Sequence, residues 1–178
     1  MKYHHIINAL AGSYSLLNRT TYVETSCCRC NTRLTNPRHR GGKISVELDW
    51  IGVLTYTPGG YLSAITASTN PELRPLVLGW PPKTIDSVSD WAQVGKSSFC
   101  FAGPFHISPD LPASITSGQL VHGPMEVTTL PSFMGVSEIR NYTLDVRRDG
   151  TYLTWHLWLN DNGSDRVAVY WKKHQVRP

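Results

Sequence analysis

The chain has 178 residues, of which 40% are hydrophobic and 17% charged, and it contains six Trp, eight Tyr and four Phe. This length fits one ordinary domain, and the composition excludes an intrinsically disordered chain. The formal net charge of +4 arises in one basic stretch over residues 29–43 that holds no acidic residue, so a nucleic-acid partner is not expected.

The apolar segments exclude a membrane-spanning chain, because none approaches the length that crosses a bilayer. The run over residues 6–11 is interrupted by Asn8, which makes it only a weak imitation of a signal peptide. We therefore expect a cytoplasmic protein without a membrane partner.

The cysteines do not have the spacing of a metal site. Cys27, Cys28 and Cys30 stand close together, but a structural zinc site needs a second pair of ligands at a set distance, and Cys100 stands alone. We predict no metal ion and no disulfide framework.

Apolar and polar residues alternate over most of the chain, with turn residues between the alternating segments. This period of two predicts many short strands, and therefore one all-β domain over residues 1–178, a barrel or a sandwich. Residues 26–43 have no periodicity and predict an irregular basic loop. Within residues 52–66, Pro58 and Gly60 predict a hairpin turn, because proline suits the first turn position and glycine tolerates positive φ.

One helix is predicted around residues 84–94. Ile85, Val88 and Trp91 share one stripe of that helix, and Gly95 is a suitable residue to end it. We expect this short helix to cap one end of a barrel.

The second half of the chain predicts further strands, the first of which covers residues 99–107 with a bend at Gly103 and Pro104. The later strands each present one face at alternate positions: Leu120 and His122; Arg140, Tyr142 and Leu144; Leu153, Trp155, Leu157 and Leu159; and Val167, Val169 and Trp171.

The order of these motifs resembles the lipocalin-like domain family of bacteria and filamentous fungi. Tyr14 follows Gly12 where the family usually has Gly-x-Trp, and residues 52–64 contain the core Tyr-Thr-Pro-x-Gly-Tyr-x-Ser-Ala. The further matches are Phe101-Ala102-Gly103 with Phe105, Val121-His122, residues 126–135 with Pro131, Arg140, Leu153 and Trp171 followed by a basic residue.

The resemblance covers about residues 9–173 and implies a single antiparallel up-and-down β-barrel that encloses a ligand cavity. It also implies two roles for that cavity. Several fungal proteins with such barrels steer the cyclisation or isomerisation of polyketide, terpenoid or alkaloid intermediates, and other members of the wider lipocalin group only carry ligands.

Polar side chains at interior positions are the candidates for catalysis. His122 titrates near neutrality and can move a proton, unless it is a core histidine bonded to a backbone carbonyl. Arg140 can stabilise an enolate or hold a carboxylate, or it can stack on Tyr14 as a structural cation. Glu126 lies at an even spacing from His122 and would form an acid–base pair with it, unless a bulge at residues 123–124 leaves it on the surface.

The interior aromatic side chains would bind an apolar ligand, although core packing explains them equally well. These candidates are Tyr14, Tyr56, Phe101, Tyr142, Trp155 and Trp171.

The chain has no phosphate-binding glycine loop, no nucleophile elbow and no histidine pair at helical metal spacing, so we predict no cofactor. The leading hypothesis is a cofactor-independent cyclase or isomerase that acts on a largely apolar natural-product intermediate, as a monomer or homodimer. The alternatives are a non-catalytic carrier of a lipophilic molecule and a structural module whose interior is filled.

Overall fold

The structure, a computed structural model, describes residues 3–24, 42–47, 49–158 and 165–175. Two α-helices and two short 3-10 helices, Pro71–Leu73 and Pro131–Phe133, accompany the strands of the described chain. The α-helices and strands are α1 (His4–Leu10), β1 (Gly12–Glu24), β2 (Gly42–Glu47), β3 (Trp50–Tyr56), β4 (Tyr61–Ser68), α2 (Val88–Lys96), β5 (Ser98–Ile107), β6 (Ser117–His122), β7 (Val127–Thr128), β8 (Glu138–Arg147), β9 (Gly150–Trp158) and β10 (Asp165–Lys173).

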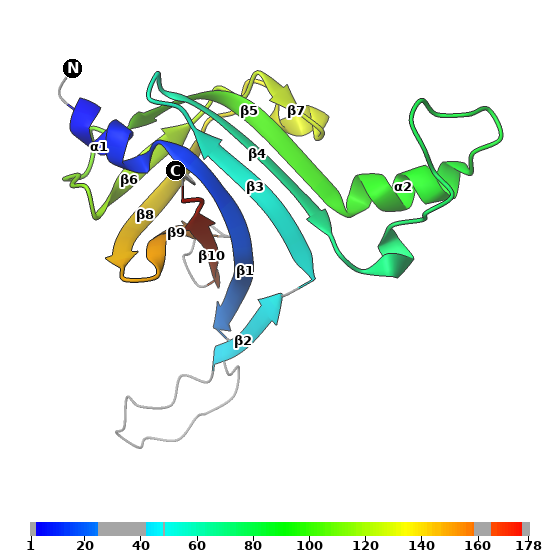
Figure 1. The fold of residues 1–178 in the computed structure, drawn as a ribbon, viewed down its shortest axis with the longest axis horizontal. Coiled ribbons are helices and arrows are strands. Elements are labelled where there is room, and N and C mark those ends of the chain that lie inside the picture. The colour runs from blue at the N-terminus through cyan, green and yellow to red at the C-terminus, as the bar shows by residue number, and fades with distance from the viewer. Residues whose placement is uncertain (1–2, 25–41, 48, 159–164, 176–178) are drawn as a thin grey trace, which may run out of the picture.

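Eight of these strands form a closed antiparallel barrel, which confirms the predicted fold class (Figure 1). The order around the barrel is β1, β3, β4, β5, β6, β8, β9 and β10, and β10 pairs with β1 to close it. β2 extends the sheet beside the second half of β1, and β7 pairs with β5. Most of the predicted basic loop, residues 26–41, lies outside the described residues, and residues 42 and 43 belong to β2.

The predicted hairpin turn joins β3 to β4. Gly60 has a φ of +79°, and its backbone N–H donates to the carbonyl oxygen of Thr57 at 3.1 Å. Glycine adopts such a backbone angle without the steric cost that other residues incur. The turn places Tyr56 opposite Leu62 on the inner face of the barrel, where both are buried.

The barrel end is closed by α1, a helix that the sequence reasoning did not predict. Ile6 and Leu10 lie one turn apart on α1, and both are fully buried. The last carbonyls of α1 accept hydrogen bonds from outside the helix: the Tyr14 hydroxyl donates to Leu10 at 2.6 Å, and the Lys173 ammonium donates to Ala9 at 3.0 Å. These bonds satisfy orphan carbonyls at the helix C-terminus, which also favours a positive charge.

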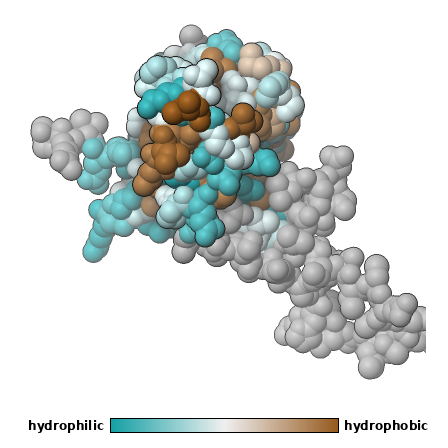
Figure 2. All heavy atoms as spheres, turned by 90° about the vertical axis from the view of Figure 1, so that its right-hand side faces the viewer, coloured by the Kyte–Doolittle hydropathy of each residue, from teal (hydrophilic) through white to brown (hydrophobic). Residues whose placement is uncertain are grey.

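The helix predicted around residues 84–94 exists as α2, but it lies on an arm that projects from the barrel (Figure 1). None of its residues is buried. Figure 2 faces this side of the molecule and shows apolar residues at the surface. The most exposed large apolar side chains of the arm are Leu76, Val77, Trp80, Ile85 and Val88. The apolar stripe therefore predicted the helix correctly, but the expectation that this helix caps one end of the barrel was wrong.

No helix among the described residues combines the length and the apolar character that crossing a membrane requires.

Candidate functional site

The barrel interior is filled at the end near α1. We call this region the packed end and define it by Leu10, Tyr14, Leu54, Tyr56, Phe105 and His122, all of which are buried. The Tyr56 ring packs against the rings of Phe105 and His122, with centroid distances of 4.6 Å and 5.6 Å.

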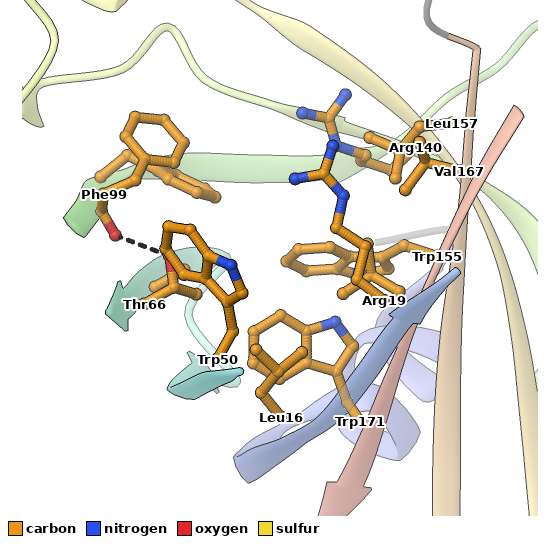
Figure 3. A pocket seen from close by; sticks show the side chains of 13 residues that line it. Leu16, Arg19, Trp50, Thr66, Phe99, Arg140, Trp155, Leu157, Val167 and Trp171 are labelled. Carbon is orange, nitrogen blue, oxygen red and sulfur yellow. Dashed lines mark hydrogen bonds between the residues drawn. The ribbon is translucent and has the colours of Figure 1, made fainter. Parts of the chain in front are cut away.

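Toward the other end the interior opens into a cavity of about 240 Å³. Its described lining residues are Leu16, Arg19, Trp50, Ala64, Thr66, Phe99, Phe101, Arg140, Trp155, Leu157, Val167, Val169 and Trp171 (Figure 3). Trp155 and Trp171 form one wall with their ring centroids 5.0 Å apart, and Phe99 and Phe101 contact each other at 5.2 Å. Flat rings on facing walls suit a ligand that is itself flat and apolar.

Arg140 brings a positive charge to this cavity from β8. Its side chain is 12% exposed, and its Nη1 group donates to the Glu138 carboxylate at 2.8 Å and to the Ile139 carbonyl at 2.9 Å. Its Nε–H group is buried and has no hydrogen-bond partner among the described residues. The Nε1–H group of Trp171, a residue that is 1% exposed, is also buried without a partner in the described part of the chain.

Arg19 reaches the same cavity because β1 contains a bulge. Tyr14 and Leu16 face inward at alternate positions, and the pairing with β10 then shifts by one residue between Leu16 and Asn18. The extra residue changes which positions face inward, so Arg19 rather than Asn18 lines the cavity. In Figure 3 the Arg19 and Arg140 head groups both lie above the Trp155 ring.

A hydrogen-bonded chain of three side chains separates the cavity from the packed end. The indole Nε1–H of Trp155 donates to the Tyr56 hydroxyl oxygen at 3.1 Å, and that hydroxyl is 2.7 Å from Nε2 of His122. Because the Tyr56 oxygen accepts the indole proton of Trp155, its own hydroxyl proton is free to be donated to Nε2 of His122. Nε2 is then unprotonated, and His122 carries its proton on Nδ1. Trp155 therefore belongs to both regions, whereas Tyr56 and His122 lie behind it.

Burial holds this chain in its neutral form. It lowers the pKa of His122 well below its usual value, and the positive charge of Arg140 lowers that pKa further. Burial likewise raises the pKa of Tyr56 well above 10. His122 is thus an uncharged member of the core.

Comparison with known protein families matches residues 46–174 to the lipocalin-like domain. The chain belongs to the lipocalin-like domain family. This finding confirms the resemblance seen in the sequence, and a lipocalin-like barrel with such a cavity suits the binding of a small molecule. No curated protein and no solved structure matches the chain significantly.

The lipocalin-like barrel brings some of the predicted site residues together and separates others. Those that line the cavity are Arg140, Phe101, Trp155 and Trp171. Those that are buried outside its lining are His122, Tyr14, Tyr56 and Tyr142. Tyr142 uses its hydroxyl to donate to the Ser114 carbonyl.

The predicted pair of His122 and Glu126 does not form. Gly123 has a φ of +113°, and a Cβ atom there would lie 2.5 Å from the Val136 carbonyl oxygen, so the chain leaves the strand at a position that requires glycine. Glu126 is exposed outside the barrel, where it accepts a hydrogen bond from the Tyr61 hydroxyl at 2.9 Å.

The structural pairing considered for Arg140 and Tyr14 does not form either, because another cation takes that place. The Lys173 ammonium lies 5.6 Å from the centroid of the Tyr14 ring. Arg140 lines the cavity instead of stacking on Tyr14.

Three residues that line the cavity were not predicted from the sequence as site residues: Arg19, Trp50 and Phe99. Trp50 lies on the same face of β3 as Leu54 and Tyr56, so alternation alone could have indicated it. Phe99 has the same relation to Phe101. For Arg19 no such signal exists, because simple alternation from Tyr14 places it on the outer face.

Metal ligands do not gather in the part of the chain that the structure describes: no three His, Cys, Asp or Glu side chains come together there.

Proposed function

We propose that this lipocalin-like protein is a cofactor-independent isomerase or cyclase that holds a largely apolar natural-product intermediate in the cavity. The observation that carries the proposal is the Arg140 guanidinium, whose buried Nε–H has no partner among the described residues and lies at a cavity walled by aromatic rings. A donor fixed in this way can polarise a substrate carbonyl and stabilise the negative charge that develops on its oxygen.

The aromatic walls would supply the second part of catalysis. A reactive chain pressed between Trp155 and Phe99 loses much of its conformational freedom, and holding the reacting atoms close together lowers the barrier to ring closure. A volume of about 240 Å³ lies below the range of about 300–1,000 Å³ that is common for ligand pockets. The substrate in this proposal is therefore small.

His122 does not have the role of general base in this proposal. His122 is fully buried and lies outside the described lining of the cavity. Its Nε2 atom is already engaged in a hydrogen bond with the Tyr56 hydroxyl. A general base must come within hydrogen-bond reach of the proton that it removes. Orientation and polarisation by Arg140 are accordingly the proposed source of rate acceleration.

A carrier of a lipophilic metabolite is the second candidate. It is favoured by the lining, in which the described side chains are mainly apolar and the charged ones are arginines, which remain protonated at neutral pH. A carrier would bind its ligand and release it unchanged.

Incubation with extracts of a host that makes candidate pathway intermediates distinguishes the two. We expect the wild-type protein to produce a compound of unchanged mass and altered retention time in liquid chromatography with mass spectrometry. Arg140→Gln should lose most of this conversion. Arg147→Gln is the matched control, because Arg147 lies on the same strand with its side chain 60% exposed and paired with Asp145. A ligand recovered unchanged from all three proteins would support the carrier instead.

A further inference from the structure

The described wall of the cavity carries positive charge and no carboxylate. Its ionisable side chains are those of Arg19 and Arg140, and Glu138 meets Arg140 from outside the lining through one nitrogen, Nη1. Figure 3 shows both guanidinium groups on the same side of the cavity. Both guanidinium groups carry a positive charge at neutral pH, and an anion bound in the cavity would be attracted to them.

Two unused hydrogen-bond donors belong to the same lining. They are the buried Nε–H of Arg140 and the buried Nε1–H of Trp171. Buried polar groups in folded proteins nearly always have a partner, and an unsatisfied one costs free energy. An acceptor oxygen delivered by a bound molecule would give these donors the partner that the described protein does not provide.

We infer that the ligand of this cavity is a small, flat, unsaturated molecule that carries an anionic oxygen group, a carboxylate or an enolate, which binds at the guanidinium groups of Arg19 and Arg140. This inference rests on the proposed function, since it requires that a small molecule occupies the cavity. It adds the charge of the ligand and the direction in which it lies.

The direction follows from the arrangement of the walls. The arginine head groups occupy one side of the cavity, while the rings of Trp50 and Phe99 lie across from them (Figure 3). An oxyanion at the arginines leaves the apolar body of the ligand among these rings and those of Trp155 and Trp171. Guanidinium groups suit this task because their planar array of N–H donors matches the two oxygens of a carboxylate.

The electrostatics of the neighbouring core agree with this assignment. Burial lowers the pKa of His122, and the positive charge of Arg140 lowers it further, so the charge of Arg140 acts on a group of the neighbouring core. The same positive charge would attract an anion bound beside Arg140.

The test compares two probes that share one ring system: 2-naphthoate, which is ionised at pH 7.5, and 2-naphthamide, which is neutral and of similar shape. Isothermal titration calorimetry measures the binding of each probe to the full chain. We expect wild-type protein to bind 2-naphthoate at least about 10-fold more tightly than 2-naphthamide, a ratio typical of a charge-assisted hydrogen bond. Arg140→Gln should reduce this ratio to about twofold, while Arg147→Gln should leave it unchanged.

The outcomes separate the two proposals. If wild-type protein binds the amide as tightly as the carboxylate, the inference about charge is overturned and binding of an apolar molecule stands. If neither probe binds, cavity binding itself fails and the inference fails with it. The wild-type comparison needs no variant, and near-UV circular dichroism checks that Arg140→Gln retains the native packing of its aromatic side chains.

Discussion

At the packed end of the barrel, aromatic side chains contact one another and share hydrogen bonds, whereas at the cavity similar side chains surround open space. Tyr14 and Tyr56 at the packed end each have a partner for the hydroxyl group. At the cavity, Trp171 and Arg140 each keep a buried N–H group for which the described residues provide no partner. Nδ1 of His122 at the packed end is likewise buried without a partner among the described residues. The two regions therefore differ mainly in packing: side chains fill the packed end, whereas those of the cavity surround open space.

This difference indicates that one end of the barrel stabilises the fold and the other end is available to a ligand. Side chains of the packed end contribute their buried area to the stability of the fold. Side chains around the cavity bury less of their apolar area in the protein alone. A bound ligand would cover the remaining area, and this burial would favour binding. Substitutions at the packed end should accordingly change stability, and substitutions at the cavity should change ligand affinity.

The largest expected effect belongs to the packed end. Leu54→Ala removes a fully buried side chain from β3 and should lower the free energy of unfolding by about 2–5 kcal/mol, because the neighbouring rings cannot close the resulting gap completely. Urea denaturation measures this loss. Val53→Ala is the matched control, since the adjacent Val53 side chain points outward and is 49% exposed, and its expected cost is only about 0.5 kcal/mol. Equal losses in the two variants would contradict the assignment of Leu54 to the core.

Alternation predicted the inner faces of the strands well but did not distinguish these two regions. His122 and Trp155 both occupy inward positions as expected, yet only Trp155 lines the cavity. The height of a residue along the barrel depends on the stagger between strands, and a period of two carries no information about stagger. For this reason the sequence identified His122 as an interior residue and misplaced it with respect to the ligand space.

Two further differences have local causes. The bulge in β1 that turns Arg19 inward involves one extra residue and no distinctive amino acid, so it leaves no pattern to detect. The helix that closes the barrel, α1, is short, and its apolar positions resemble a weak leader segment. Its role depends on contacts with Tyr14 and Lys173, which are distant from each other in sequence.

An intermediate effect is expected from pH. Because the folded chain lowers the pKa of His122, the unfolded chain takes up a proton first as the pH falls below about 6.5. The free energy of unfolding should then decrease by up to about 1.4 kcal/mol per pH unit from this one group, and it should be independent of His122 above that range. Denaturation curves between pH 7.5 and 5 measure the slope.

His122→Gln isolates this contribution. Glutamine does not titrate and can still present an acceptor to the Tyr56 hydroxyl, so the slope should become shallower by nearly one proton. His106→Gln serves as the control because His106 is exposed on the outer face of β5, and it should keep the wild-type slope. An unchanged slope in His122→Gln would show that the buried histidine is not responsible.

The smallest expected effect belongs to the cavity and concerns affinity more than stability. Trp50→Ala should weaken the binding of 2-naphthoate and of 2-naphthamide by about 10-fold each, since it removes an aromatic wall that both probes contact through the same ring system. Trp80→Ala is the control, because Trp80 is 88% exposed on the arm and should change neither affinity. Arg140→Gln, in contrast, should affect the carboxylate selectively. If Trp50→Ala also weakened only the carboxylate, the rings and the charge would not act as separate parts of the site, and the proposed orientation of the ligand would be wrong.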